Sequence, residues 1–210
     1  PVKTISIPKV EADDVIAYLS KSVITHPKDK SFIVSSDKDF LQLVDENVVV
    51  YRPMEKEYYT PQTVIDKYKL SPHNFILHKT LLGDNSDKIK GVKGLGEKGL
   101  LKKFPELIEK DMSWDDILNI CEEKISEHLV YARIIHGRDD LEKNYKIMDL
   151  SNPMLSKEDK IWLDEIVASD NLPYYPDQFV SMYNEDQIGG LIRNVEFWVK
   201  DCFNNLVIKK

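Results

Sequence analysis

Residues 83–104 read GDNSDKIKGVKGLGEKGLLKKF and combine two kinds of candidate site. Asp84 and Asp87 are three residues apart, so on a helical turn their carboxylates would point the same way and could share one hard cation. The segment 91–96 carries three glycines, which permit positive φ angles and leave backbone amides open to an anion. Helix-compatible sequence resumes at Glu97, where unpaired N–H groups would favour phosphate. A tight turn between two helices with a solvated lysine face is the alternative interpretation.

The charge of the chain is unevenly distributed. Its 210 residues hold 29 Lys and Arg against 36 Asp and Glu, a net charge of −7, which is unlike a protein that coats nucleic acid through a uniformly basic surface. Basic residues concentrate instead over 88–103. No run of apolar residues is long enough to span a membrane and no signal pattern opens the chain, which predicts a cytoplasmic protein without a membrane segment. Cys121 and Cys202 lack the spacing of a zinc site or a disulfide framework.

Further carboxylates lie at the start of a predicted helix over 11–19. Three acidic residues in a first turn are ordinary partners of the helix dipole, and this explanation competes with a role as metal ligands. These residues are Glu11, Asp13 and Asp14.

Asp37 and Asp39 follow a short apolar run at 31–35, which predicts a strand buried on both faces of a parallel sheet. Ligands bind outside the carboxyl ends of such strands. Two crowded aspartates raise each other's pKa unless a cation or solvent compensates, and an N-cap role would explain only Asp37. Ligand sets made of oxygen alone favour Mg²⁺ or Mn²⁺ over zinc.

The remaining patterns predict an α/β beginning and a mainly helical remainder. We expect a short strand or an extended lead-in at 2–7, a strand at 47–52 with 57–60 as its hairpin partner, and a strand or extended return at 145–150. We expect helices at 60–68, 73–82, 105–110, 114–124, 127–144, 157–168, 176–183 and 188–203. Core packing is expected for Leu129, Ile134, Ile135, Trp162, Phe197 and Trp198, and surface or capping positions for His128 and His136.

The block GDNSD followed by GVKGLGEKG resembles the hairpin region of 5′-nucleases. This family comprises flap endonucleases, the 5′-exonuclease domains of bacterial DNA polymerase I, and phage 5′-nucleases with ribonuclease H activity, which look closest. EADD at 11–14 and SSDKDF at 35–40 are similar to two further carboxylate motifs of the family, so the resemblance covers most of 9–150.

The resemblance implies a fold and its division. It implies an α/β chain with a partial PIN-like, Rossmann-like nuclease core and a parallel sheet over 1–82. A helix-hairpin-helix region for DNA binding would follow over 83–150, and a C-terminal helical region over 151–210.

The resemblance also implies a Mg²⁺-dependent 5′-3′ exonuclease or flap endonuclease that uses two Mg²⁺ or Mn²⁺ ions. Its substrates would be duplex or flap DNA, or RNA–DNA hybrids, in replication and primer removal, with replication proteins as partners. Glu11, Asp13 and Asp37 would lie nearest the first ion and Asp39, Asp84 and Asp87 around the second, with Asp14 a ligand or in the outer shell. The implied catalytic residues are Asp13, Asp37, Asp39 and Asp84. The hairpin would grip duplex DNA, with a K⁺ ion on its carbonyls, through Gly91, Val92, Lys93, Gly94, Leu95, Gly96 and Lys98.

The front of the family pattern is missing from this sequence. Family members begin with a strand that bears a metal-binding aspartate, followed by a helical arch that clamps single-stranded 5′ ends. We therefore expect the chain to bind duplex DNA but to cleave weakly by itself. A non-catalytic duplex DNA-binding module and a PIN-type ribonuclease are the alternative interpretations.

Overall fold

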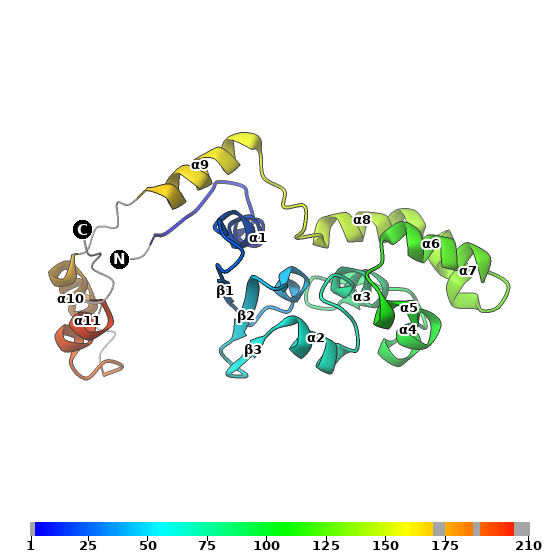
Figure 1. Ribbon diagram of the computed structural model, residues 1–210, viewed down its shortest axis with the longest axis horizontal. Coiled ribbons are helices and arrows are strands. Elements are labelled where there is room, and N and C mark those ends of the chain that lie inside the picture. Colours follow the sequence, from blue (N-terminus) through cyan, green and yellow to red (C-terminus); the bar gives the residue numbers. More distant parts are fainter. Residues whose placement is uncertain (1–2, 170–174, 187–189, 204–210) are drawn as a thin grey trace. The chain divides into compact units, whose positions relative to one another are not determined.

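The computed structural model describes residues 3–169, 175–186 and 190–203 (Figure 1). The chain divides into two compact units, one of Pro8–Lys160 and one of Pro1–Ile7 with Ile161–Lys210. The candidate site residues all lie in the first of these units. The predicted functional division at residues 82 and 150 stays a prediction.

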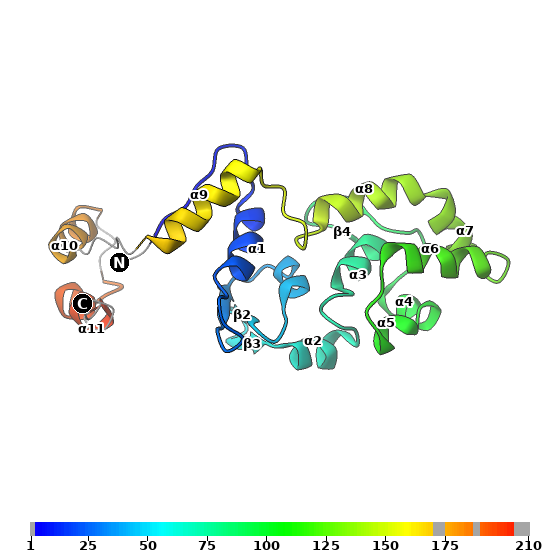
Figure 2. The same ribbon diagram turned by 45° about the horizontal axis from the view of Figure 1, so that its top comes forward.

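A three-stranded sheet forms the α/β part of the larger unit. Its strands are β1 (Ser31–Val34), β2 (Val48–Arg52) and β3 (Glu57–Tyr59), with β1 parallel to β2 and β3 antiparallel to it. Helix α1 (Ala12–Ser22) and the 3₁₀ helix η1 (Asp39–Leu43) pack on one face of the sheet (Figure 2). The core there contains Ala17, Ile33, Phe40, Val48, Val50 and Tyr59. The α/β fold class is therefore confirmed.

The opposite face of this sheet carries apolar side chains that are open to solvent. Phe32 and Val34 alternate with the buried Ile33, and their exposed fractions are 58% and 66%. Tyr58 on β3 meets Phe32 edge-on, with ring centroids 6.3 Å apart. The expectation that 31–35 is buried on both faces is wrong, because the helices that make this core pack on one face only.

Helices dominate the rest of the larger unit. They are α2 (Pro61–Tyr68), α3 (Phe75–Leu82), α4 (Glu97–Lys103), α5 (Glu106–Glu109), α6 (Trp114–Glu123), α7 (Leu129–His136) and α8 (Arg138–Met148). The short hairpin of β4 (Gly83–Asp84) and β5 (Ile89–Lys90) interrupts them. Local sequence explains several starts, since Ser113 and Asp116 form a capping box and Thr60 caps α2 ahead of Pro61.

Three expectations about this helical region are wrong. The predicted return strand at 145–150 is mostly the end of α8, because Tyr145 lies against the helical core beside Trp114. The single helix predicted at 127–144 is two helices that meet at Gly137. Leu129 is 60% exposed rather than buried, whereas His128 caps α7, as one of its two expected roles requires.

The smaller unit contains α10 (Pro176–Glu185) and α11 (Val195–Phe203), and α9 (Lys157–Ala168) ends in it. The predicted packing role of Trp198 is confirmed, because its ring stacks on Phe179 with centroids 5.9 Å apart. Phe197 is 67% exposed, so its predicted core position is wrong. Described residues 3–7 form no strand, and the predicted helix at 188–203 begins at Val195, with 187–189 outside the described residues. Among the described residues no helix is long and apolar enough to cross a membrane.

Candidate metal centre and DNA-binding hairpin

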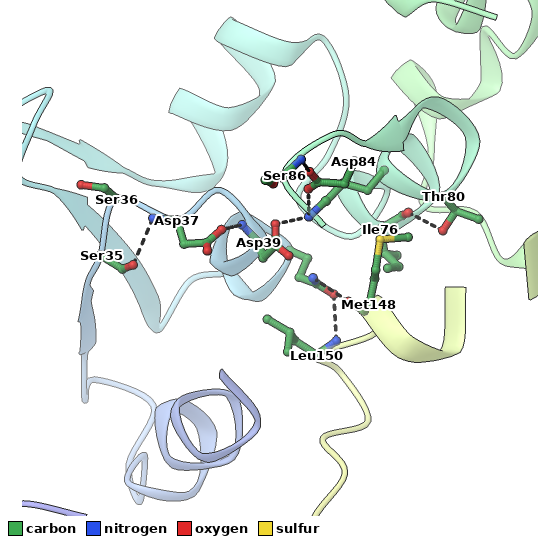
Figure 3. Close-up of polar contacts among 12 residues, drawn as sticks. Ser35, Ser36, Asp37, Asp39, Ile76, Thr80, Asp84, Ser86, Met148 and Leu150 are labelled. Atoms are coloured by element: carbon green, nitrogen blue, oxygen red, sulfur yellow. Dashed lines mark hydrogen bonds and ion pairs between the residues drawn. The ribbon is translucent and has the colours of Figure 1, made fainter. Parts of the chain in front are cut away.

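Three aspartates from two distant segments come together in the larger unit. Asp39 begins η1, Asp84 ends β4, and Asp87 lies in the turn before β5. One carboxylate oxygen from each lies within 4.8 Å of the other two. Figure 3 shows Asp39 and Asp84 approaching each other from separate parts of the chain. Three carboxylates at this spacing fit a divalent cation, because hard cations prefer oxygen ligands.

The reason for the Asp84–Asp87 proximity differs from the expected one. The sequence spacing suggested a helical turn, but Asp84 is in a strand and Asp87 is in the hairpin turn. The Ser86 amide donates to Asp84 Oδ1 at 2.8 Å, and the Ser86 hydroxyl bonds the same oxygen. The turn thus closes on Asp84 and brings Asp87 back toward it.

Lys79 places a positive charge between the two segments, and the sequence reasoning missed it. Its ammonium bonds Asp39 and lies 2.8 Å from Asp84 Oδ2, and the residue is only 5% exposed. A buried lysine in this position shows that the paired carboxylates need a cation. The signal in the sequence was one lysine inside the apolar segment FILHKTLL, directly before the acidic block.

The pKa values of these groups reflect burial and the contacts with Lys79. Burial raises the pKa of Asp39, and the carboxylates of Asp37 and Asp84 add to this, while Lys79 opposes it. The contacts with Lys79 and Ser86 hold the pKa of Asp84 well below its usual range. Burial alone would lower the pKa of Lys79, but its bonds to Asp39 and Asp84 raise it. Asp84 is therefore ionised and available as a ligand at neutral pH.

The four carboxylates nearer the amino terminus lie outside this cluster. Asp13 lies within electrostatic reach of Asp37 and Asp39, since burial and then these two charges raise its pKa. Asp14 accepts a hydrogen bond from the Met154 amide at 2.9 Å. Glu11 is the exposed N-cap of α1 and makes no side-chain cap hydrogen bond. Of the seven predicted ligands, the structure brings three into one cluster.

The segment that carries Asp37 and Asp39 is fixed by its own hydrogen bonds (Figure 3). The Asp37 amide donates to Ser35 Oγ at 3.0 Å, and the Asp39 amide donates to Asp37 Oδ1 at 2.9 Å. Asp37 thus accepts the first amide of η1, although the N-cap residue of that helix is Lys38 and not Asp37 as the alternative interpretation held, while Asp39 belongs to the cluster. A pocket of about 570 Å³ opens beside these residues, and its lining includes Asp37, Asp39, Asp84, Arg52 and His78.

The glycine hairpin, residues 91–96, follows the β4–β5 hairpin. It is exposed at its tip and packed against the core at its base. Lys93, Gly94, Gly96 and Lys98 are exposed, and Gly94 adopts a φ of +83°. The side chains of Val92 and Leu95 are each 8% exposed and belong to the helical core. Contacts of these two residues with a nucleic acid strand would therefore come from their backbone.

Gly91 has a packing role that the sequence did not reveal. A Cβ atom there would lie 2.1 Å from the carbonyl carbon of Leu82, and the Val92 amide donates to Leu81 O at 2.8 Å. The glycine thus lets the hairpin backbone lie directly on the end of α3. On the other side of the hairpin, Arg133 Nη1 donates to Lys93 O at 2.7 Å.

Comparison with known proteins agrees with this arrangement. Residues 1–69 match the family model described as the 5′-3′ exonuclease, N-terminal resolvase-like domain. The chain is 35% identical over 164 residues to a 5′-3′ exonuclease of Aquifex aeolicus (strain VF5), an alignment that covers 75% of this chain and 52% of that protein. Residues 1–69 therefore match a domain of 5′-3′ exonucleases, and a relative of that name extends the likeness over 75% of the chain.

Further relatives match over similar regions. The thermostable DNA polymerase I of Thermus thermophilus is 34% identical over 141 residues, which cover 62% of this chain and 16% of that protein. The chain spans about half the length, or less, of the curated relatives it matches.

Solved structures share the fold of this chain. The phage T5 5′-exonuclease with bound zinc ions has a TM-score of 0.65 and 21% identity, with 78% of this chain and 61% of that one covered. The phage T5 flap endonuclease in a pseudo-enzyme-product complex with DNA and metal ions has a TM-score of 0.64 and the same coverage. The predicted partial PIN-like core followed by a helical part is therefore confirmed.

Proposed function

We propose that this chain forms the metal-binding and duplex-binding part of a Mg²⁺-dependent 5′-nuclease. The observation that carries the proposal is the convergence of Asp39, Asp84 and Asp87 within 4.8 Å, next to a lysine-flanked hairpin. The reaction is hydrolysis of a phosphodiester in flap or duplex DNA, or in an RNA–DNA hybrid, during replication or primer removal. Replication proteins are its proposed partners.

The acidic residues have distinct roles in this proposal. When bound, two Mg²⁺ or Mn²⁺ ions supply an activated water and stabilise the leaving oxygen. Asp39, Asp84 and Asp87 hold the second ion, and Glu11, Asp13 and Asp37 lie toward the first, with Asp14 in the outer shell. Lys79 keeps Asp39 and Asp84 together when the site lacks metal, because its ammonium bonds both.

The hairpin positions the duplex in this proposal. Exposed Lys93 and Lys98 contact phosphates, and the open backbone around Gly94 and Gly96 allows a strand to approach closely. Carbonyls of the same loop are the proposed ligands of a K⁺ ion. Phosphate contacts of this kind fix the register of a duplex without reading its sequence.

Metal titration tests the proposal directly. We expect the wild-type chain to bind Mn²⁺, observed by electron paramagnetic resonance or calorimetry, and Asp39→Asn and Asp84→Asn each to weaken binding by roughly tenfold or more, since they remove ligands. Asp66→Asn is the matched control, because Asp66 lies on α2 and its carboxylate accepts a hydrogen bond from Gln62, away from the cluster. Mn²⁺ binding that persists unchanged in the Asp39→Asn/Asp84→Asn double variant contradicts the proposal.

Cleavage is the second measurement. A 5′-flap duplex with Mg²⁺ is the substrate, and the same two variants are expected to abolish whatever cleavage the wild-type chain shows. Binding is the more decisive of the two, because the chain spans about half the length of its relatives.

A further inference from the structure

Arg52 is a buried cation next to the acidic segment that the proposed chemistry does not use. It ends β2 and is 7% exposed. Burial of a guanidinium costs free energy unless its donors are satisfied, and the Nε atom of Arg52 is buried without a hydrogen-bond partner among the described residues. Because a buried donor without a partner lowers stability, the presence of arginine at this position needs an explanation other than stability.

The contacts of Arg52 identify that reason. Its Nη2 atom donates to the backbone carbonyl of Ser36 at 2.7 Å, and its Nη1 atom pairs with Glu55. The guanidinium lies 5.5 Å from the centre of the Tyr59 ring, which itself is 1% exposed. The guanidinium is thus held against the buried Tyr59 ring, and its Nη2 atom holds the carbonyl of Ser36, the residue directly before Asp37.

The hydrogen bond from Arg52 to the Ser36 carbonyl ties the acidic segment, residues 35–39, to another strand. Ser35 Oγ accepts the Asp37 amide and Asp37 Oδ1 accepts the Asp39 amide, but these bonds are internal to the segment. The Arg52 bond connects the segment to the neighbouring strand through a side chain. Arg52 also lines the same pocket as Asp39 and Asp84.

We propose that Arg52 is a positioning residue of the metal centre, which holds the Ser36 carbonyl and with it the segment of Asp37, so that Asp39 keeps its orientation toward Asp84. The inference rests on the proposed divalent metal site. Groups behind the ligands fix their orientation in metalloproteins, and removal of such groups costs 10- to 100-fold in metal affinity, as an order of magnitude.

The test is the Mn²⁺ dissociation constant of Arg52→Met, measured together with urea unfolding. Methionine has a similar length and often replaces a buried ion without loss of folding. We expect Arg52→Met to fold cooperatively and to bind Mn²⁺ about tenfold more weakly. Glu55→Gln is the matched control: it removes the ion pair but keeps the Ser36 contact, so its Mn²⁺ affinity is expected to equal that of the wild type.

Arg52→Lys keeps the charge and one donor, but an ammonium cannot reach both partners with the fixed fork of a guanidinium. We expect an intermediate loss of roughly threefold, and this variant decides the question if Arg52→Met fails to fold. Wild-type Mn²⁺ affinity in every folded Arg52 variant overturns the inference, as does an equal loss in Glu55→Gln. A wild-type chain that binds no Mn²⁺ instead overturns the proposed function.

Discussion

The acidic cluster and the glycine hairpin are held in place by different means. Asp39 and Asp84 are held by side chains, chiefly the ammonium of Lys79 that bonds both. The hairpin is held by backbone, since Gly91 lies against Leu82 with no room for a Cβ atom. The cluster should therefore respond to charge, metal and pH, and the hairpin to added volume.

The largest expected effect is the loss of stability when Gly91 of the glycine hairpin is replaced by alanine. In Gly91→Ala the new Cβ atom would lie 2.1 Å from the carbonyl carbon and 2.2 Å from the carbonyl oxygen of Leu82. Both are backbone atoms that cannot rotate away, so α3 and the hairpin must separate. We expect the free energy of unfolding to fall by about 4 kcal/mol or more, measured by urea denaturation.

Gly96→Ala provides the control within the same loop. Apart from its chain neighbours, no described residue would have an atom within 4 Å of the added methyl group, and the φ of −119° at this position suits any residue. A change of less than about 0.5 kcal/mol is expected, as for an ordinary surface substitution. Equal losses in the two variants would show that general loop flexibility, rather than contact with Leu82, sets the stability.

Lys79→Met tests how the acidic cluster is held together, and its expected effect on stability is somewhat smaller. Removal of the ammonium leaves Asp39 and Asp84 facing each other without compensation, so we expect a loss of about 3 kcal/mol in metal-free buffer at neutral pH. Mn²⁺ should restore much of this loss, because a ligand that binds only the folded state stabilises it. Urea unfolding with and without Mn²⁺ measures both effects.

Lys67→Met is the matched control for Lys79→Met. Lys67 also bridges two carboxylates, Glu55 and Glu57, but its side chain is 39% exposed. Such a surface pair contributes little to stability, and its loss should not depend on Mn²⁺. If Mn²⁺ stabilises Lys79→Met no more than Lys67→Met, the Lys79 ammonium and the cation do not compete for the same carboxylates; if it stabilises neither variant, the acidic cluster is not a metal site.

The contrast between the glycine hairpin and the acidic cluster also explains what the sequence could predict. The hairpin and most helices were accessible because glycine spacing, caps and apolar periodicity are local signals, as at Ser113 and Thr60. The convergence of Asp39 with Asp84 was inferred correctly because strand ends and helix ends tend to meet at one edge of a sheet.

The parts that sequence reasoning missed depend on contacts between distant segments. Lys79 and Arg52 look like ordinary surface charges until the fold buries them beside the cluster. Gly91 resembles an open phosphate contact in the sequence, whereas its reason for being glycine lies in Leu82. The end of α8 resembles a strand because β-branched and aromatic residues at 145–150 outweigh the periodicity of Leu141, Tyr145 and Met148.

The exposed lysines of the hairpin provide a test of DNA binding that leaves stability untouched. Lys93→Ala and Lys98→Ala should each weaken duplex binding by roughly 1 kcal/mol and lower the slope of log K against log salt by about 1, since each removes one phosphate contact. Fluorescence anisotropy with a labelled duplex over a salt series measures both quantities. Lys28→Ala is the charge-matched control, because Lys28 is exposed in the loop before β1. A slope that falls equally in all three variants would assign the effect to net charge alone.

The smallest expected effect returns to the acidic cluster and depends on pH. Burial, with the charges of Asp37 and Asp39, raises the pKa of Asp13 in the folded state. The folded chain then holds this proton more tightly than the unfolded chain, so stability falls as pH rises from about 4 through the raised pKa. Asp13→Asn removes that loss and should stabilise the metal-free chain at pH 7 by a few tenths of a kcal/mol, because solvent screens a partly exposed group.

This gain should vanish at about pH 3 and below, where the carboxyl group is largely protonated in both states. Saturating Mn²⁺ should reverse its sign at pH 7, because the wild-type chain then has an additional ligand for the cation. Urea unfolding at the two pH values, with Asp66→Asn as the control for loss of a carboxylate on α2, measures the difference. Asp13→Asn that is less stable than the wild type in metal-free buffer at pH 7 would mean that Asp13 is held by a positive partner rather than crowded by its neighbours, and the cluster would then end at Asp39.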